Sequence, residues 1–131
     1  MSASDLNTAS IGQLAVRVHD LDRAIGFYRD VLGLPLLFQA PPGLAFFKAG
    51  GVRLMLSRPE QAAFDHPGAI VYYAVTDIEA THRTLADRGV PFLETPRVIH
   101  RTPASELWMA FFEDSEGNPI ALMSEKPVAG S

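Results

Sequence analysis

The sequence predicts an α+β fold of two tandem βαβββ modules, arranged as a barrel-like pair of sheets around a central cleft. The first observation is an internal repeat. Residues 20–36 and residues 77–92 share an initial Asp, a short amphipathic helix pattern and a Gly-apolar-Pro-apolar ending. The second observation is that a strand-like run precedes each copy and further strand-like runs follow it. Because repetition at a fixed spacing marks a repeated structural unit, two equivalent modules are expected.

The first module is expected over residues 11–58, after a flexible leader over residues 1–10. Asp20 can cap the helix, because its carboxylate can accept a hydrogen bond from an early helix N–H. Gly33 fits the position just past the helix end, and Pro35 prevents the helix from continuing. The expected elements are a strand over 11–18, a helix over 21–32 and strands over 34–39, 44–48 and 52–57.

A linker rich in Pro and Gly is expected over residues 59–68, and the second module then repeats the same order over residues 69–125. Residues 126–131 are expected to form a disordered tail. The elements expected in this module are a strand over 69–76, a helix over 77–88, strands over 92–94 and 97–101 or one bent strand, and strands over 107–113 and 119–124, with turns at 102–105 and 114–118.

Composition limits the classes of function. The chain has 131 residues, of which 47% are hydrophobic and 20% charged, as in one soluble globular domain. A formal net charge of −4 without a basic run argues against nucleic acid as a partner. The absence of Cys excludes a thiolate nucleophile or a thiolate metal site. No signal peptide pattern and no membrane-spanning apolar run are seen, so no membrane partner and a cytoplasmic location are expected.

Two stretches of the sequence resemble the vicinal oxygen chelate superfamily, which includes glyoxalase I, bleomycin-resistance proteins and extradiol dioxygenases. These stretches are residues 20–34, DLDRAIGFYRDVLGL, and residues 112–122, FEDSEGNPIAL. The resemblance extends over residues 11–125 and implies paired βαβββ modules around a cleft. It does not imply one activity, because unrelated functions occur on one fold.

The resemblance also implies positions for a divalent metal. Such enzymes use a His or Gln on the first strand of each module and often a Glu on the last strand. The corresponding residues here are Gln13, Met55, Ile70 and Ala121; strand alternation favours Met55 over Leu54. Only Gln13 matches a family ligand. The usual metal site is therefore expected to be missing, no cofactor is expected, and a divalent metal is the disfavoured alternative.

Arg17 follows Gln13 by four residues, so both side chains should lie on one face of the strand. The resemblance to glyoxalase-like enzymes implies that Arg17 holds an anionic group of the substrate. An equally good interpretation is an Arg that is paired internally with an Asp or Glu, since a charged group on an inward face needs a partner. Tyr72, two residues after Ile70, should also share a face with it and direct its hydroxyl into the cleft.

His100 and Glu106 are weak catalytic candidates. They flank the turn at residues 102–105, and Trp108 follows closely. One interpretation is a cleft wall that offers an imidazole, a carboxylate and an indole. The alternative, which we favour, is an ion pair between Arg101 and Glu106 across the hairpin, with Trp108 in the core.

Three functions remain open. The preferred function is binding or sequestering of a small, partly apolar or aromatic molecule, as in bleomycin-resistance proteins. The second is a metal-assisted lyase, isomerase, epimerase or dioxygenase-like enzyme with a displaced site. The third is an interaction domain with a filled cavity. A homodimer is expected, because modules of this superfamily pair between chains as well as within one. The expected ligand-binding residues are Gln13, Arg17, Met55, Ile70, Tyr72, Trp108 and Ala121.

Overall fold

The structure is a computed structural model of the chain. It describes residue 7, residues 11–59, residues 62, 65, 66 and 68, and residues 70–128. Most of the expected leader, half of the expected linker and the last residues of the expected tail lie outside the described residues.

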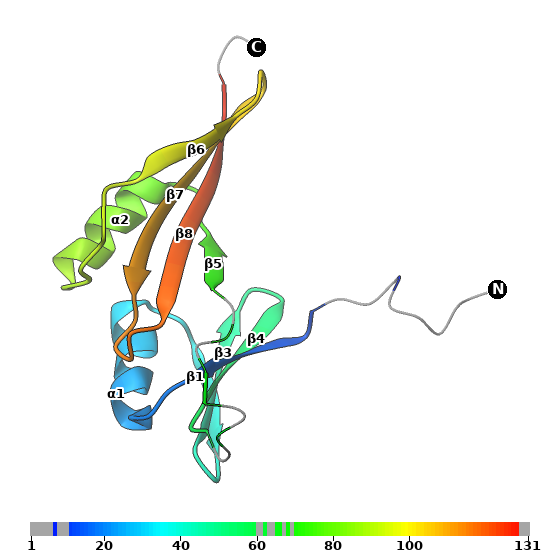
Figure 1. The fold of residues 1–131 in the computed structure, drawn as a ribbon, viewed down its shortest axis with the longest axis vertical. Coiled ribbons are helices and arrows are strands. Elements are labelled where there is room, and N and C mark those ends of the chain that lie inside the picture. Colours follow the sequence, from blue (N-terminus) through cyan, green and yellow to red (C-terminus); the bar gives the residue numbers. More distant parts are fainter. Residues whose placement is uncertain are drawn as a thin grey trace.

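The first module contains a four-stranded sheet, called sheet A, and a helical segment that covers one of its faces (Figure 1). β1 and β4 are parallel, and the other neighbouring strands are antiparallel. In sheet A the strand order is β1-β4-β3-β2. The elements are β1 (Gln13–Arg17), α1 (Leu21–Gly26), the π-helix η1 (Phe27–Val31), β2 (Leu36–Ala40), β3 (Leu44–Ala49) and β4 (Val52–Ser57).

The second module repeats this topology in sheet B, whose strand order is β5-β8-β7-β6. Here β5 and β8 are the parallel pair. The elements are β5 (Val71–Ala74), α2 (Ile78–Asp87), β6 (Arg97–Arg101), β7 (Ser105–Glu113) and β8 (Pro119–Pro127). Because the two modules share one strand order and one helix position, the predicted α+β fold of tandem βαβββ modules is confirmed.

Two strand assignments in the second module were wrong. Residues 92–94 form no strand; the N–H of Leu93 donates one hydrogen bond to the carbonyl of Phe111 at 3.0 Å. The last strand is longer than expected and enters the predicted tail, because β7 begins at Ser105, which pairs with Pro127 at the end of β8. The backbone of residues 125–127 is therefore held by strand pairing.

The expected barrel-like closure is not formed within the chain, where sheets A and B remain separate. The physical reason is the position of the core. Both helices lie on the same side of the molecule (Figure 1), and one continuous core lies beneath them. In this core the Tyr28 and Phe47 rings are 6.0 Å apart and the Phe92 and Phe112 rings 5.0 Å apart. Within the chain, each sheet is therefore covered by this core on its helix side only.

The predicted helix cap at Asp20 is present, and Asp77 caps the second helix in the same way. The carboxylate of Asp20 accepts from the N–H of Arg23 at 3.0 Å, and that of Asp77 accepts from the N–H of Ala80 at 3.1 Å. The first helix differs from expectation after Gly26, where it continues as η1. No helix in the described part of the chain is long and apolar enough to cross a membrane.

Candidate ligand-binding site

Each sheet has one face turned away from its helix, and we call this its open face. Alternation along the strands determines which side chains lie there. In β1, Val16 is buried on the helix side, whereas Gln13 is exposed on the open face. The open faces keep large apolar and aromatic side chains accessible to solvent: Phe38 on sheet A is 47% exposed, and Tyr72 on sheet B is 43% exposed.

On sheet A the open face brings Gln13 and Met55 together, as strand alternation predicted. The Gln13 Nε2 atom lies 3.7 Å from the Met55 sulfur, and Leu54 is buried on the opposite face. The amide oxygen of Gln13 accepts a hydrogen bond from Nε of Arg53 at 2.8 Å. The oxygen that could coordinate a ligand is therefore already engaged by a cation.

Arg17 lies on the same open face, where its side chain is 24% exposed. Its guanidinium lies 3.3 Å from the carboxylate of Asp65, which His19 also contacts at 3.0 Å. The pKa of Asp65 lies below its usual value, mainly because of the hydrogen bond from His19 and to a smaller extent because of the hydrogen bond from Arg17. The internal ion pair, one of the two interpretations of Arg17, is the contact that the structure contains.

On sheet B the open face carries three more of the predicted residues, Ile70, Tyr72 and Ala121. Tyr72 lies directly opposite Ala121 in the β5–β8 register, and its ring meets Phe111 edge-on at 6.0 Å. Ile70 is 42% exposed, whereas Ala121 is fully buried by its neighbours. The predicted ligand residues other than Trp108 are thus divided between the open faces of two sheets and do not surround one cavity within the chain.

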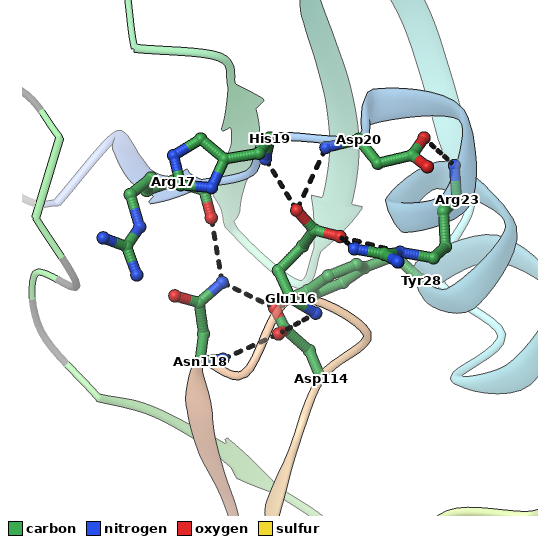
Figure 2. Close-up of polar contacts among 8 residues, drawn as sticks. All are labelled: Arg17, His19, Asp20, Arg23, Tyr28, Asp114, Glu116 and Asn118. Carbon is green, nitrogen blue, oxygen red and sulfur yellow. Dashed lines mark hydrogen bonds and ion pairs between the residues drawn. The ribbon is translucent and has the colours of Figure 1, made fainter.

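The turn between β7 and β8 fixes the two modules relative to each other (Figure 2). The carboxylate of Glu116 accepts from the backbone N–H groups of His19 at 2.6 Å and Asp20 at 3.0 Å, and from the guanidinium of Arg23. Its side chain is only 3% exposed. Burial raises the pKa of Glu116, but these hydrogen bonds outweigh that effect and hold the pKa below its usual value.

Asp114 completes the same turn. Its carboxylate accepts from the Tyr28 hydroxyl at 2.7 Å and from the backbone N–H groups of Glu116 and Asn118, both at 2.8 Å. The Asn118 amide also donates to the carbonyl of Arg17 at 2.9 Å. We call residues 114–118 the inter-module turn. The sequence predicted a turn here but not its docking; the only signal was the density of capping side chains in DSEGN.

A cleft of about 650 Å³ lies between the modules on the helix side. Its walls are mainly apolar, and of the seven predicted ligand-binding residues it includes Tyr72 alone. This is not the predicted cleft, which was expected between the sheet faces that point away from the helices, and the residues expected to line that cleft lie mostly elsewhere.

Comparison with known proteins identifies the family. The family model described as Glyoxalase/Bleomycin resistance protein/Dioxygenase superfamily matches residues 10–122. The chain belongs to this superfamily. Among curated protein sequences, none matches the chain.

Several solved structures share the fold of this chain. A lactoylglutathione lyase from Agrobacterium tumefaciens is 25% identical, with a TM-score of 0.71 over 90% of this chain and 95% of the other. TnmS3, an antibiotic binding protein from Streptomyces sp. CB03234, is 23% identical, with a TM-score of 0.71 over 95% and 100%. A superfamily member from Sphaerobacter thermophilus DSM 20745 is 22% identical, with a TM-score of 0.73 over 88% and 97%.

The weak catalytic candidates of this superfamily member are not brought together. His100 lies opposite Leu107 and Glu106 lies opposite Arg101, so successive residues of β7 place the two candidates on opposite faces of sheet B. The expected pairing of Arg101 with Glu106 is present at 2.9 Å. The pKa of Glu106 lies below its usual value, mainly because of the hydrogen bond from Arg101 and to a smaller extent because of the hydrogen bond from Trp108.

Trp108 lies on the helix side of sheet B and packs against the core. Its indole N–H donates to Glu106 at 3.2 Å, and the Lys126 ammonium lies 4.2 Å from the ring centroid. Trp108 is thus separated by the sheet from Tyr72 and Ala121. Within the described residues, no group of three or more His, Cys, Asp or Glu side chains is placed to hold a metal ion.

Proposed function

We propose that this chain binds a small, partly aromatic molecule between the open face of sheet A and the open face of sheet B from a second copy. The observation that carries the proposal is the exposure of aromatic and apolar side chains on both open faces, including Phe38, Ile70 and Tyr72. Aromatic rings contribute much of the binding energy in ligand sites, and both sheets offer them.

A homodimer would account for both open faces at once. In a twofold-symmetric pair, sheet A of each chain can face sheet B of the other, so the contact occurs twice and the assembly is closed. Gln13, Arg17 and Met55 of one chain would then oppose Ile70, Tyr72 and Ala121 of the other. The inter-module turn supports this arrangement, because it fixes both open faces within each chain.

The superfamily's usual divalent metal does not fit these positions. Met55, Ile70 and Ala121 have no oxygen or nitrogen in their side chains, and the amide oxygen of Gln13 is bound by the Arg53 guanidinium at 2.8 Å. A dication beside this guanidinium would be repelled. The proposed function therefore uses no metal, and ligand binding rests on shape, aromatic contact and the local charge. In TnmS3, a protein of the same fold serves as an antibiotic binding protein.

An enzyme with a displaced metal site is the second candidate. It rests on the Gln13 match and on the 25% identity with a lactoylglutathione lyase. Elemental analysis of the purified protein, with thermal unfolding at increasing divalent ion, separates the two candidates. The binding proposal expects no stoichiometric metal and no stabilisation. A stoichiometric metal that raises the melting temperature would overturn it in favour of the enzyme.

The dimer is tested by the solution mass of three forms of the protein, measured by light scattering. The unsubstituted chain is expected at twice the mass of one chain. Phe38→Asp places a charge on the open face of sheet A and is expected to give single chains. Leu93→Asp is the matched control: Leu93 is 71% exposed but belongs to neither sheet, so its substitution should leave the dimer intact. A monomeric unsubstituted chain would contradict the proposal.

A further inference from the structure

Sheet A has an unusual charge distribution. Its four strands contain Arg17, Lys48 and Arg53 and no Asp or Glu, although the whole chain has a formal net charge of −4. The strands of sheet B, by contrast, contain Glu106, Glu113 and Glu125 as well as the cations Arg97, Arg101 and Lys126. Both sheets therefore have three cations in their strands, but only in sheet A are they not balanced by carboxylates of the same sheet.

Two of these cations face each other directly. In the antiparallel β3–β4 register, Lys48 pairs with Arg53, so their side chains leave the sheet side by side on the open face. Like charges at directly opposite positions destabilise a strand pair. Arg17 is paired with Asp65, but within the described residues no carboxylate lies within ion-pair distance of Lys48 or Arg53. A bound anion would remove the repulsion between Lys48 and Arg53.

The Arg53 guanidinium is held in place. Its Nε donates to Gln13 at 2.8 Å, and its central carbon lies 5.0 Å from the Phe46 ring centroid. Phe46 in turn stacks on Phe38, with centroids 4.5 Å apart and planes 24° from parallel. Because Gln13 holds Nε and the Phe46 ring lies against one face of the guanidinium, the two terminal nitrogens remain able to donate hydrogen bonds to a planar anion such as a carboxylate.

A shallow hollow of about 260 Å³ lies beside these cations. Lys48, Arg53 and three glycines, Gly12, Gly50 and Gly51, contribute to its walls. Nothing lies within 4 Å of the position where a Cβ of any of these glycines would be, so the backbone is accessible to a small group. Its size accommodates one anionic substituent beside Lys48 and Arg53, and the Arg53 guanidinium links this hollow to the Phe46 ring.

We infer that the ligand is a planar aromatic molecule with an anionic substituent, that Lys48 and Arg53 bind the anion, and that the aromatic part stacks on Phe38. This inference rests on the proposed function, since it assigns a ligand class to the open face of sheet A. Gln13 is then a positioning residue for Arg53. Carboxylate, sulfonate and phosphate groups share the required chemistry, and the experiment separates them.

The test compares naphthoate, naphthalenesulfonate and naphthyl phosphate with neutral naphthamide by isothermal titration calorimetry of the full chain. At least one anionic probe is expected to bind about tenfold or more tightly than naphthamide, which corresponds to about 1.4 kcal/mol. This preference should shrink as NaCl is raised, because salt screens the exposed cations. The order among the three probes identifies the anion.

The variants Lys48→Gln and Arg53→Gln should each remove most of the preference for the anion while leaving naphthamide binding within about twofold. Arg29→Gln is the matched control, because Arg29 is an exposed cation on η1, 49% exposed and paired with Asp30. Lys48→Glu places a carboxylate opposite Arg53; it should abolish anion binding without lowering the melting temperature, which excludes misfolding as the cause.

The possible results separate the two proposals. Equal binding of anionic and neutral probes by the unsubstituted chain would overturn this inference and leave the proposed function standing. A preference for anions that survives both Gln substitutions would overturn the roles of Lys48 and Arg53. Failure of every aromatic probe to bind a protein shown to be folded would overturn both proposals.

Discussion

The Glu116 carboxylate of the second module accepts a hydrogen bond at 2.9 Å from Nε of Arg23 in the first module (Figure 2). The same carboxylate also accepts from two backbone N–H groups just before α1. A side chain more than ninety positions away in sequence therefore stabilises the start of this helix. The stability of the first helix and the placement of the second module are consequently coupled.

Glu116→Ala is expected to lower the free energy of unfolding by about 1–3 kcal/mol, because it removes the partner of two backbone N–H groups and leaves them without a compensating acceptor. Urea unfolding of both proteins measures the difference. Glu94→Ala is the control: Glu94 pairs with Arg97 but is 46% exposed, so little change is expected. Equal effects of the two substitutions would contradict the structural role of Glu116.

The contribution of Glu116 should depend on pH. Its folded-state pKa lies below the usual value, so its stabilising effect is present above the unfolded-state pKa, near 4.3, and is lost as pH falls through the folded pKa. The stability difference between the unsubstituted chain and Glu116→Gln should therefore be large near neutral pH and shrink below about pH 4. A difference that stays constant over this range would show that the charge of Glu116 is irrelevant.

Two tyrosines, Tyr28 and Tyr73, provide a matched pair. Burial, and then the nearby Asp114 carboxylate, raises the pKa of Tyr28, whose hydroxyl donates to Asp114 at 2.7 Å. Tyr28→Phe should cost about 1–2 kcal/mol in the free energy of unfolding. Within the described part of the chain the Tyr73 hydroxyl is buried without a hydrogen-bond partner, so Tyr73→Phe should be neutral or stabilising. Urea unfolding distinguishes these outcomes, and the reverse order would refute the assignment.

Tyr72 and Trp108 lie on opposite faces of sheet B and should respond differently to ligand. Under the proposed function, Tyr72→Ala weakens binding of an aromatic probe such as naphthoate by about tenfold, because an exposed ring on the open face is lost. Trp108→Phe should leave the affinity within about twofold, since Trp108 packs on the helix side. Calorimetric titration gives both values; a larger loss for Trp108→Phe would place the ligand on the helix side.

The sequence predicted the fold because its signals are local. Asp20 caps the first helix as expected, Asp77 at the start of the second repeat does the same, and the repeated strand order follows from the repeated sequence pattern. The relation of His100 to Glu106 could not be predicted in this way. The β6–β7 register shifts between Val98 and His100, and such an irregularity changes which side chains share a face without a clear sequence pattern.

The docking of the inter-module turn and the separation of the sheets were also beyond local signals. Glu116 contacts His19 and Arg23 only because the tertiary arrangement places the inter-module turn beside the start of α1. Whether the two sheets close around a cleft depends on their open faces, which remain exposed within one chain, as Phe38 and Tyr72 show. Alternation did place Met55 rather than Leu54 beside Gln13, since that relation depends on one strand pair.

The π-helix η1 shows how the two modules can differ in length by one residue and still have the same strand order. The spacing from Asp20 to Gly33 is one residue longer than the equivalent spacing from Asp77 to Gly89. In a regular α-helix an added residue would rotate all following positions by about 100°. A π turn absorbs it locally, as the hydrogen bond from Leu32 to the carbonyl of Phe27 shows. One repeat has thus accepted an insertion while the sheet behind it keeps the strand order of the other.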